Sequence, residues 1–289
     1  MVEYILGNYL VETGRITKEQ LAETLEKQDS VRVKLGLIAV AEGMMTLAQT
    51  DEVNRLQAVM DKRFGDIAIS KGYLTDEQIG KLLKKQGDAY MTFIQTLVDS
   101  QFVTLKEFDL IVEEFRNAKG FSNSEINALK SDEADRIVPL YIPEAGKKFA
   151  DIITVAVRTL IRLMDRHIYV GQAQMVHAFP AEGQVSQALV GEDGLISCLS
   201  ELDGALLKLA CTFGQEEFTS LDMDSLDAAG ETLNCINGLY ASSESRNGKF
   251  LELMPPDYSD VTTKAKTTIC RIPIYIGDQG LYFTVADLV

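Results

Sequence analysis

The sequence predicts an all-α helical-repeat domain followed by an α+β domain in which two long helices pack on one antiparallel sheet. Three observations predict this fold class. Residues 5–115 repeat with a period of 29, and residues 118–147 are polar and contain two closely spaced prolines. Beyond residue 148, helical and strand-like patterns interleave without the strict alternation of a doubly wound sheet. We therefore expect domains at 1–117 and 148–289, joined by a junction at 118–147.

The N-terminal repeats form three aligned units, at 5–28, 34–57 and 63–86, with five residues between neighbours. A fourth unit, 93–115, keeps the apolar pattern without the glycines. Every unit has a threonine followed three residues later by Gln or Glu, the spacing of a capping box at a helix start. These pairs are Thr17/Gln20, Thr46/Gln49, Thr75/Gln78 and Thr104/Glu107.

A glycine stands three residues before the threonine in the first three units, where a preceding short helix should end. These glycines are Gly14, Gly43 and Gly72; the fourth unit has Gln101 instead. Each unit is therefore predicted to be a short helix, a turn and a longer helix. One such unit cannot bury its apolar face alone, so the units should pack together.

These repeats resemble the MshEN domain, the N-terminal module of type II secretion and pilus ATPases, whose tandem unit is roughly RLGxxLxxxGxIxxxQLxxxLxxQ. Some members bind cyclic di-GMP through the Arg and the Leu-Gly backbone. Carried over, the candidate nucleotide-binding residues are Lys34, Leu35, Gly36, Arg63, Phe64 and Gly65. Ile5 stands where the first Arg belongs, Lys34 lacks the guanidinium fork, and Phe64 replaces Leu. Because helix-ending glycines explain most of the pattern, we expect protein docking or spacing ahead of nucleotide binding.

The second half is predicted to contain a helix over 149–168, with an apolar stripe at Ile152, Val155, Ala156, Leu160 and Leu163. A strand over 170–179 and a hairpin of 183–191 with 195–202 should follow, the hairpin turning at Gly191–Gly194. The remaining elements are helices over 204–213 and 220–242 and strands over 249–255, 267–276 and 280–289.

The helix over 220–242 has two contrasting faces. Its apolar stripe comprises Leu226, Ala229, Leu233, Ile236 and Tyr240. A second stripe, at Asp227, Glu231, Asn234 and Gly238, has the same spacing on a roughly opposite face. A carboxylate and an amide should thus lie side by side in solvent, with a small residue one turn further on that lets another surface approach.

The order of elements around Glu231, Asn234 and Gly238, followed by a strand and Pro255-Pro256, resembles the CheX/CheC/FliY family of chemotaxis phosphatases. The ExxN spacing alone is weak, since Glu114/Asn117 and Glu244/Asn247 share it. The resemblance implies a phosphatase that acts on the aspartyl phosphate of a receiver domain. It implies that Asn234 orients the attacking water, that Glu231 pairs with the receiver's active-site lysine, and that Asp227 and Gly238 belong to the docking face.

The resemblance also bears on cofactors and partners. The receiver would supply Mg²⁺, so the chain needs no cofactor of its own. The first long helix has Asp151 and Thr154 where CheC-type members carry a second Glu/Asn pair, which places the chain nearer CheX, a homodimer in that family. Dimerisation of this chain is left open. The alternative to the phosphatase is a non-catalytic signalling adaptor that dimerises and docks a receiver, or that binds cyclic di-GMP through its repeats.

Composition excludes several other classes. A net charge of −15 argues against non-specific binding of nucleic acid or anionic membranes, and 46% hydrophobic content excludes wholesale disorder. No apolar run approaches the ~20 residues of a membrane span, and the N-terminus does not read as a secretory signal, so we expect a cytoplasmic protein. No CxxC, HExxH, GxSxG or Walker motif is present. We expect no metal site, core thiols at Cys198, Cys211, Cys235 and Cys270, and structural histidines at His167 and His177.

Overall fold

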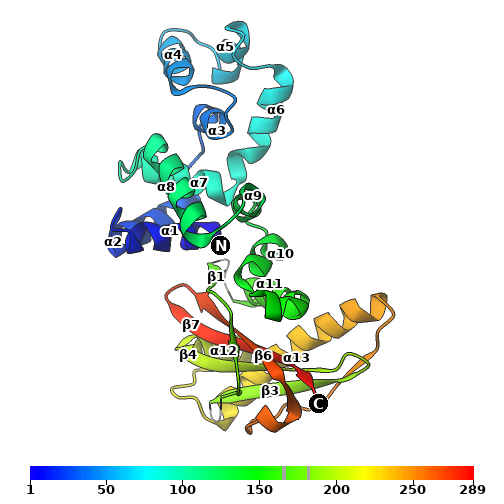
Figure 1. The fold of residues 1–289 in the computed structure, drawn as a ribbon. Coiled ribbons are helices and arrows are strands. Elements are labelled where there is room, and N and C mark those ends of the chain that lie inside the picture. The colour runs from blue at the N-terminus through cyan, green and yellow to red at the C-terminus, as the bar shows by residue number, and fades with distance from the viewer. Residues whose placement is uncertain (165–166, 181–182) are drawn as a thin grey trace. The chain divides into compact units, whose positions relative to one another are not determined.

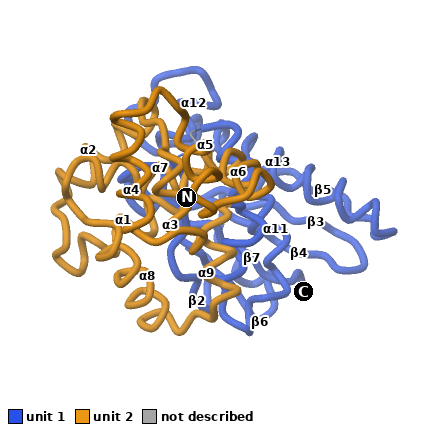
Figure 2. Tube along the Cα trace, turned by 90° about the horizontal axis from the view of Figure 1, so that it is seen from above, with its two compact units in different colours: residues 1, 133–289 blue, residues 2–132 orange. Residues whose placement is uncertain are grey.

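The computed structural model describes residues 1–164, 167–180 and 183–289. They form two compact units, residues 2–132 (orange in Figure 2) and residues 1 and 133–289 (blue). The division falls inside the stretch expected as a junction, and that stretch is helical. It contains α9 (Asn123–Lys130), α10 (Ala134–Ile137) and 3₁₀ helices at Val138–Tyr141 and Glu144–Phe149. Ser122 caps α9, in a capping box with Glu125.

The N-terminal unit contains paired helices in each of the four repeat units. The bounds are α1 (Val2–Glu12), α2 (Lys18–Lys27), α3 (Leu35–Ala41), α4 (Leu47–Gln57), α5 (Phe64–Ser70), α6 (Asp76–Lys84), α7 (Ala89–Asp99) and α8 (Leu105–Lys119), with 3₁₀ turns at Gln28–Ser30 and Lys85–Gly87. The longer helix of every pair begins directly after the predicted threonine. All four threonines accept a hydrogen bond from the backbone N–H three residues later, and the side chain there accepts one in return.

The repeated glycines have two different functions. Gly43 has φ +67°, in the left-handed region that ends a helix at low cost, and its equivalents in the first and third units do the same. Gly36 lies inside α3, where a Cβ atom would stand 2.6 Å from Thr50 Cγ2 on α4. The glycine there lets α3 approach α4 closely. In the fourth unit Gln101 takes the left-handed conformation itself, with φ 59°.

The C-terminal unit is a mixed fold of helices and an antiparallel sheet (Figure 1). The sheet order is β1-β6-β7-β4-β3-β5, with β2 also paired to β6. The strands are β1 (Ile168–Val170), β2 (Gln174–Val176), β3 (Gln184–Gly191), β4 (Leu195–Asp203), β5 (Leu251–Leu253), β6 (Ala265–Ile276) and β7 (Gln279–Leu288). The helices are α11 (Ala150–Leu163), α12 (Ala205–Gly214) and α13 (Met223–Arg246), with a 3₁₀ turn at Thr262–Lys264. α13 packs on β3, β4 and β5, and α11 and α12 pack beside it.

Two boundaries differ from the sequence prediction. The helix expected over 149–168 ends at Leu163, whose side chain is exposed, and Ile168 belongs to β1; residues 165–166 lie outside the described residues. The single strand expected over 170–179 is two short strands on β6. The pairing shifts by one residue between Val170↔Ile274 and Gln174↔Arg271. The shift spans Pro273, which has no N–H to offer the ladder.

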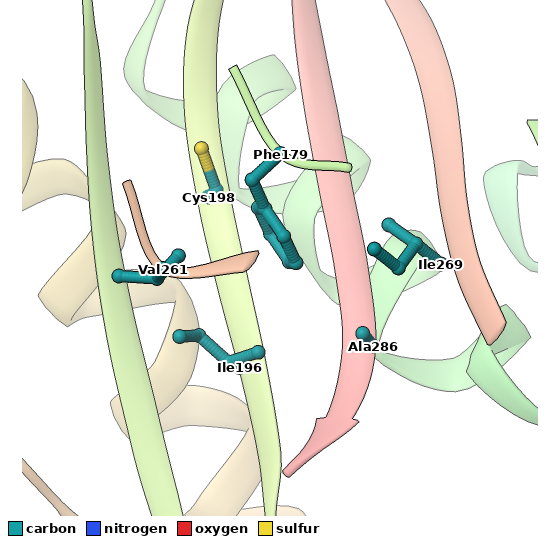
Figure 3. Close-up of a cluster of buried hydrophobic side chains, with 6 residues drawn as sticks. All are labelled: Phe179, Ile196, Cys198, Val261, Ile269 and Ala286. Carbon is teal, nitrogen blue, oxygen red and sulfur yellow. The ribbon is translucent and has the colours of Figure 1, made fainter. Parts of the chain in front are cut away.

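The face of the sheet opposite α13 has its own small core (Figure 3). Phe179 packs with Ile196, Cys198, Val261, Ile269 and Ala286, so segments before β3 and before β6 cover part of this face.

Burial raises the pKa of the Cys198 thiol well above its ordinary value. The prediction of core thiols is right for Cys198 and Cys270 and wrong for Cys235, which is exposed because it follows Asn234 on the solvent face of α13.

Among the residues that the structure describes, no helix is long and apolar enough to span a bilayer.

Candidate active site

Helix α13 has the two faces that the sequence predicts. Asp222 caps its N-terminus in a capping box with Ser225. Leu226, Ala229, Leu233 and Ile236 are buried, while Tyr240 is only partly buried. The helix is thereby fixed on the sheet by one side. Its opposite side exposes Asp227, Glu231 and Asn234.

Glu231 and Asn234 lie one helical turn apart on this exposed face. Within residues 1–164, 167–180 and 183–289, Glu231 makes no hydrogen bond or ion pair. Its carboxylate therefore stands in solvent, available to a cation brought by a partner. A lysine of a partner protein could form an ion pair with this carboxylate, and such a pair would fix how the two proteins dock.

Asp227, one turn before Glu231, is already engaged within the chain. The Tyr258 hydroxyl donates a 2.7 Å hydrogen bond to Asp227 Oδ1. Partial burial, this hydrogen bond and the nearby charges of Asp227 and Glu231 raise the pKa of Tyr258 to about 12. The hydroxyl thus stays protonated at neutral pH and keeps donating to Asp227. Tyr258 is a neighbour of the site that sequence reasoning missed.

Asn234 is held from beneath by a residue of the sheet. Gln187 on β3 donates from Nε2 to Asn234 Oδ1 at 3.0 Å and to the Met254 carbonyl at 2.8 Å. Sequence reasoning also missed Gln187, since only the strand register reveals that its side chain points toward α13. Gly238, one turn beyond Asn234, would have open space around an added Cβ, with nothing within 4 Å.

The residues proposed for nucleotide binding lie in the N-terminal unit. A cavity of about 670 Å³ is lined by four of the six predicted positions, namely Lys34, Leu35, Gly36 and Phe64, while Arg63 and Gly65 are not among its lining residues. The Lys34 ammonium pairs with Asp99 at 2.8 Å. Thr50, also at the cavity, has a buried hydroxyl with no hydrogen-bond partner among the described residues.

The described residues contain no cluster of three or more His, Cys, Asp or Glu side chains that could hold a metal ion.

Comparisons with known proteins give structural likenesses alone. No family model matches the chain, and no curated protein matches it. The fold is similar to the chemotaxis protein CheX of Desulfovibrio desulfuricans (14% identity, TM-score 0.40, 48% of this chain and 97% of that one). It is also similar to the CheX–CheY–BeF₃–Mg²⁺ complex of Borrelia burgdorferi (16%, 0.40, 48% and 96%) and to FliY of Thermotoga maritima (17%, 0.36, 50% and 90%).

These solved structures match the C-terminal half of the chain. The MshEN resemblance of the N-terminal repeats finds no support in them.

Proposed function

We propose that the C-terminal unit hydrolyses the aspartyl phosphate of a response-regulator receiver domain, and that the N-terminal unit regulates it or docks its partner. One observation carries the proposal. The exposed face of α13 presents a free carboxylate, Glu231, beside an amide, Asn234, whose oxygen is held by the sheet below. Both project from the surface of a helix, which suits a protein substrate that brings its own reacting group. The sequence resemblance to chemotaxis phosphatases supports the same reading.

The reaction makes modest demands on such a site. An aspartyl phosphate is an acyl phosphate with a good leaving group, and phosphoryl transfer needs mainly a water in line with phosphorus. The water oxygen forms a bond to phosphorus while the bond from phosphorus to the aspartyl oxygen breaks. The electron pair of that bond returns to the receiver's carboxylate, and the water's proton passes to the released phosphate or to solvent. Asn234 holds the water through its amide.

Glu231 would pair with the receiver's active-site lysine and so align the two proteins. Mg²⁺ would arrive bound to the receiver. Gly238, with open space around it, would let the receiver's backbone approach one turn beyond Asn234. Asp227 would contribute to the docking face only together with Tyr258, which already donates to it.

Phosphate release from a panel of phosphorylated receivers tests the proposal, with the wild type compared with Asn234→Ala. Equal rates for the two proteins on every receiver would refute it. Glu231→Lys separates the enzyme from the adaptor alternative. The adaptor is favoured if the wild type binds a receiver without releasing phosphate and Glu231→Lys abolishes that binding.

The cavity in the N-terminal unit favours a second candidate function, the binding of cyclic di-GMP. Four of the six motif positions line it, and Arg32 adds a cationic side chain to the lining. Because Lys34 is paired with Asp99, a phosphate would have to displace that carboxylate. Calorimetric titration with cyclic di-GMP tests this function, with Arg32→Ala as the variant and Lys62→Ala, outside the cavity lining, as the control. No heat from the wild type would eliminate it.

A further inference from the structure

Four side chains form one continuous hydrogen-bond chain from the sheet to the exposed face of α13. Ser197 Oγ on β4 donates to Asn237 Oδ1 at 2.9 Å, and Asn237 Nδ2 donates to Gln187 Oε1 at 2.8 Å. Gln187 Nε2 then donates to Asn234 Oδ1 at 3.0 Å. Ser197 and Asn237 are fully buried, and Gln187 is 2% exposed. Only the last member, Asn234, reaches solvent.

A backbone carbonyl fixes the direction of this chain. The Met254 carbonyl can only accept, so the Gln187 amide must turn its nitrogen toward it. The Gln187 oxygen then faces Asn237, which must donate, and the Asn237 oxygen is left to accept from the Ser197 hydroxyl. Both protons of Gln187 Nε2 are used, one for Met254 and one for Asn234. Asn234 must therefore turn its oxygen inward and its nitrogen outward.

We propose that Gln187 is a positioning residue for the hydrolytic reaction, with Asn237 and Ser197 holding it in place. This inference rests on the proposed phosphatase function. The outward Asn234 Nδ2 donates to the oxygen of the attacking water. That hydrogen bond occupies one lone pair of the water and leaves the other directed at phosphorus. Asn234 is the catalytic residue, because it touches the water; Gln187 acts through Asn234.

The burial of the chain argues for a function beyond packing. Buried amides cost free energy unless every donor and acceptor is satisfied, and apolar residues of similar size would fill the same space without that demand. The sequence alone gives one indication of this buried hydrogen-bond chain. Asn237 follows Leu233 by four residues, so an amide occupies a place in the buried stripe of α13.

The first test compares Gln187→Met with Gln184→Met. Gln184 is a matched control, since it is fully buried on the same strand, donates to the Ser259 carbonyl at 2.9 Å, and lies on the opposite face of the sheet from Gln187. Both substitutions remove a buried amide and should lower the melting temperature. Only Gln187→Met should lower kcat for phosphate release, by about tenfold, with KM for the phosphorylated receiver unchanged. An equal loss of kcat in the two variants would overturn the inference.

A milder pair keeps the test decisive if the methionine variants fold poorly. Ser197→Ala removes the far end of the chain, and Ser200→Ala removes a buried hydroxyl of the same strand that has no hydrogen-bond partner among the described residues. Ser197→Ala should lower kcat about two- to threefold, and Ser200→Ala should leave kcat unchanged. A wild-type rate in Ser197→Ala would count against the positioning function.

A readout without catalysis separates this inference from the proposed function. The ¹⁵N order parameter of the Asn234 side-chain amide should be high in the wild type, about 0.8, and fall below about 0.6 in Gln187→Met. Gln184→Met should keep the wild-type value. An unchanged order parameter in Gln187→Met would overturn the inference. If the order parameter falls in Gln187→Met while the wild type releases no phosphate from any receiver, the proposed phosphatase function is overturned and the orientation of Asn234 by Gln187 is upheld.

Discussion

Gly238→Ala should strengthen the fold and weaken docking at the same time. Gly238 lies in the interior of α13, and an added Cβ would meet nothing within 4 Å. Glycine inside a helix costs about 0.5–1 kcal/mol relative to alanine, because the unfolded chain loses more freedom. The substitution should therefore raise the unfolding free energy by that amount, which is about 1–4 °C in melting temperature for a unit of this size.

The same methyl group should hinder a receiver that packs against this turn of α13. Overpacking a close interface by one methyl costs about 1–3 kcal/mol, which corresponds to a fivefold or greater rise in Kd. Calorimetry should measure this with a receiver whose active-site aspartate carries beryllofluoride, a stable mimic of the phosphoryl group, in the presence of Mg²⁺. The receiver that the wild type dephosphorylates fastest is the one to use.

Gly80→Ala is the matched control. Gly80 lies inside α6 of the N-terminal unit and also has open space around an added Cβ. This variant should stabilise its own unit by a similar amount and leave receiver affinity unchanged. Receiver affinity equal to the wild type in Gly238→Ala would refute the docking function of Gly238. A loss of stability in that variant would refute the reasoning on which the magnitude rests.

Three further predictions concern the fold. Gln101→Gly should raise the unfolding free energy of the N-terminal unit by about 0.5–1 kcal/mol in a denaturant titration, because φ 59° suits glycine; no gain would contradict this. Gly36→Ala should lower it by about 1–3 kcal/mol, since the Cβ would meet Thr50 at 2.6 Å, and unchanged stability would show that the helices move apart freely. Hydrogen bonds from Lys264 and then Ser259 lower the pKa of Asp257 to about 2, from an ordinary 3.8. Because the folded pKa is the lower one, the stability from Asp257 is present above about pH 4 and is lost as the pH falls toward 2. Asp257→Asn should therefore weaken the pH dependence of the melting temperature over that range. A variant whose melting temperature falls with pH as the wild type's does would contradict this origin of the acid sensitivity.

The sequence predicted where the longer helices of the repeats begin, because a capping box consists of only four consecutive residues. Thr17, Thr46, Thr75 and Thr104 all begin a helix in the structure. The packing function of Gly36 was missed, since it depends on Thr50 being brought against it by the fold. The strand over 170–179 was predicted as one element because the interruption lies opposite Pro273, on a strand about a hundred residues later.

The candidate site divides in the same way. Periodicity along one helix was enough to predict that Glu231 and Asn234 share an exposed face. Periodicity could not identify Gln187, because its contact with Asn234 depends on how β3 packs against a helix residue 47 positions further along the chain. The engagement of Asp227 by Tyr258 likewise joins residues from two elements. Sequence thus predicted the residues of one surface, while the side chains that orient them required the fold.

The most direct test of the central claim is the rate of inorganic phosphate release from a phosphorylated receiver at saturating concentration, for the wild type and for Asn234→Ala. The substitution removes the only group proposed to hold the attacking water, and misplacing a reactant by about 1 Å costs on the order of 100-fold. We expect a loss of that size, with receiver binding retained because Glu231 remains. A variant that releases phosphate at the wild-type rate would contradict the assignment of α13 as a hydrolytic site.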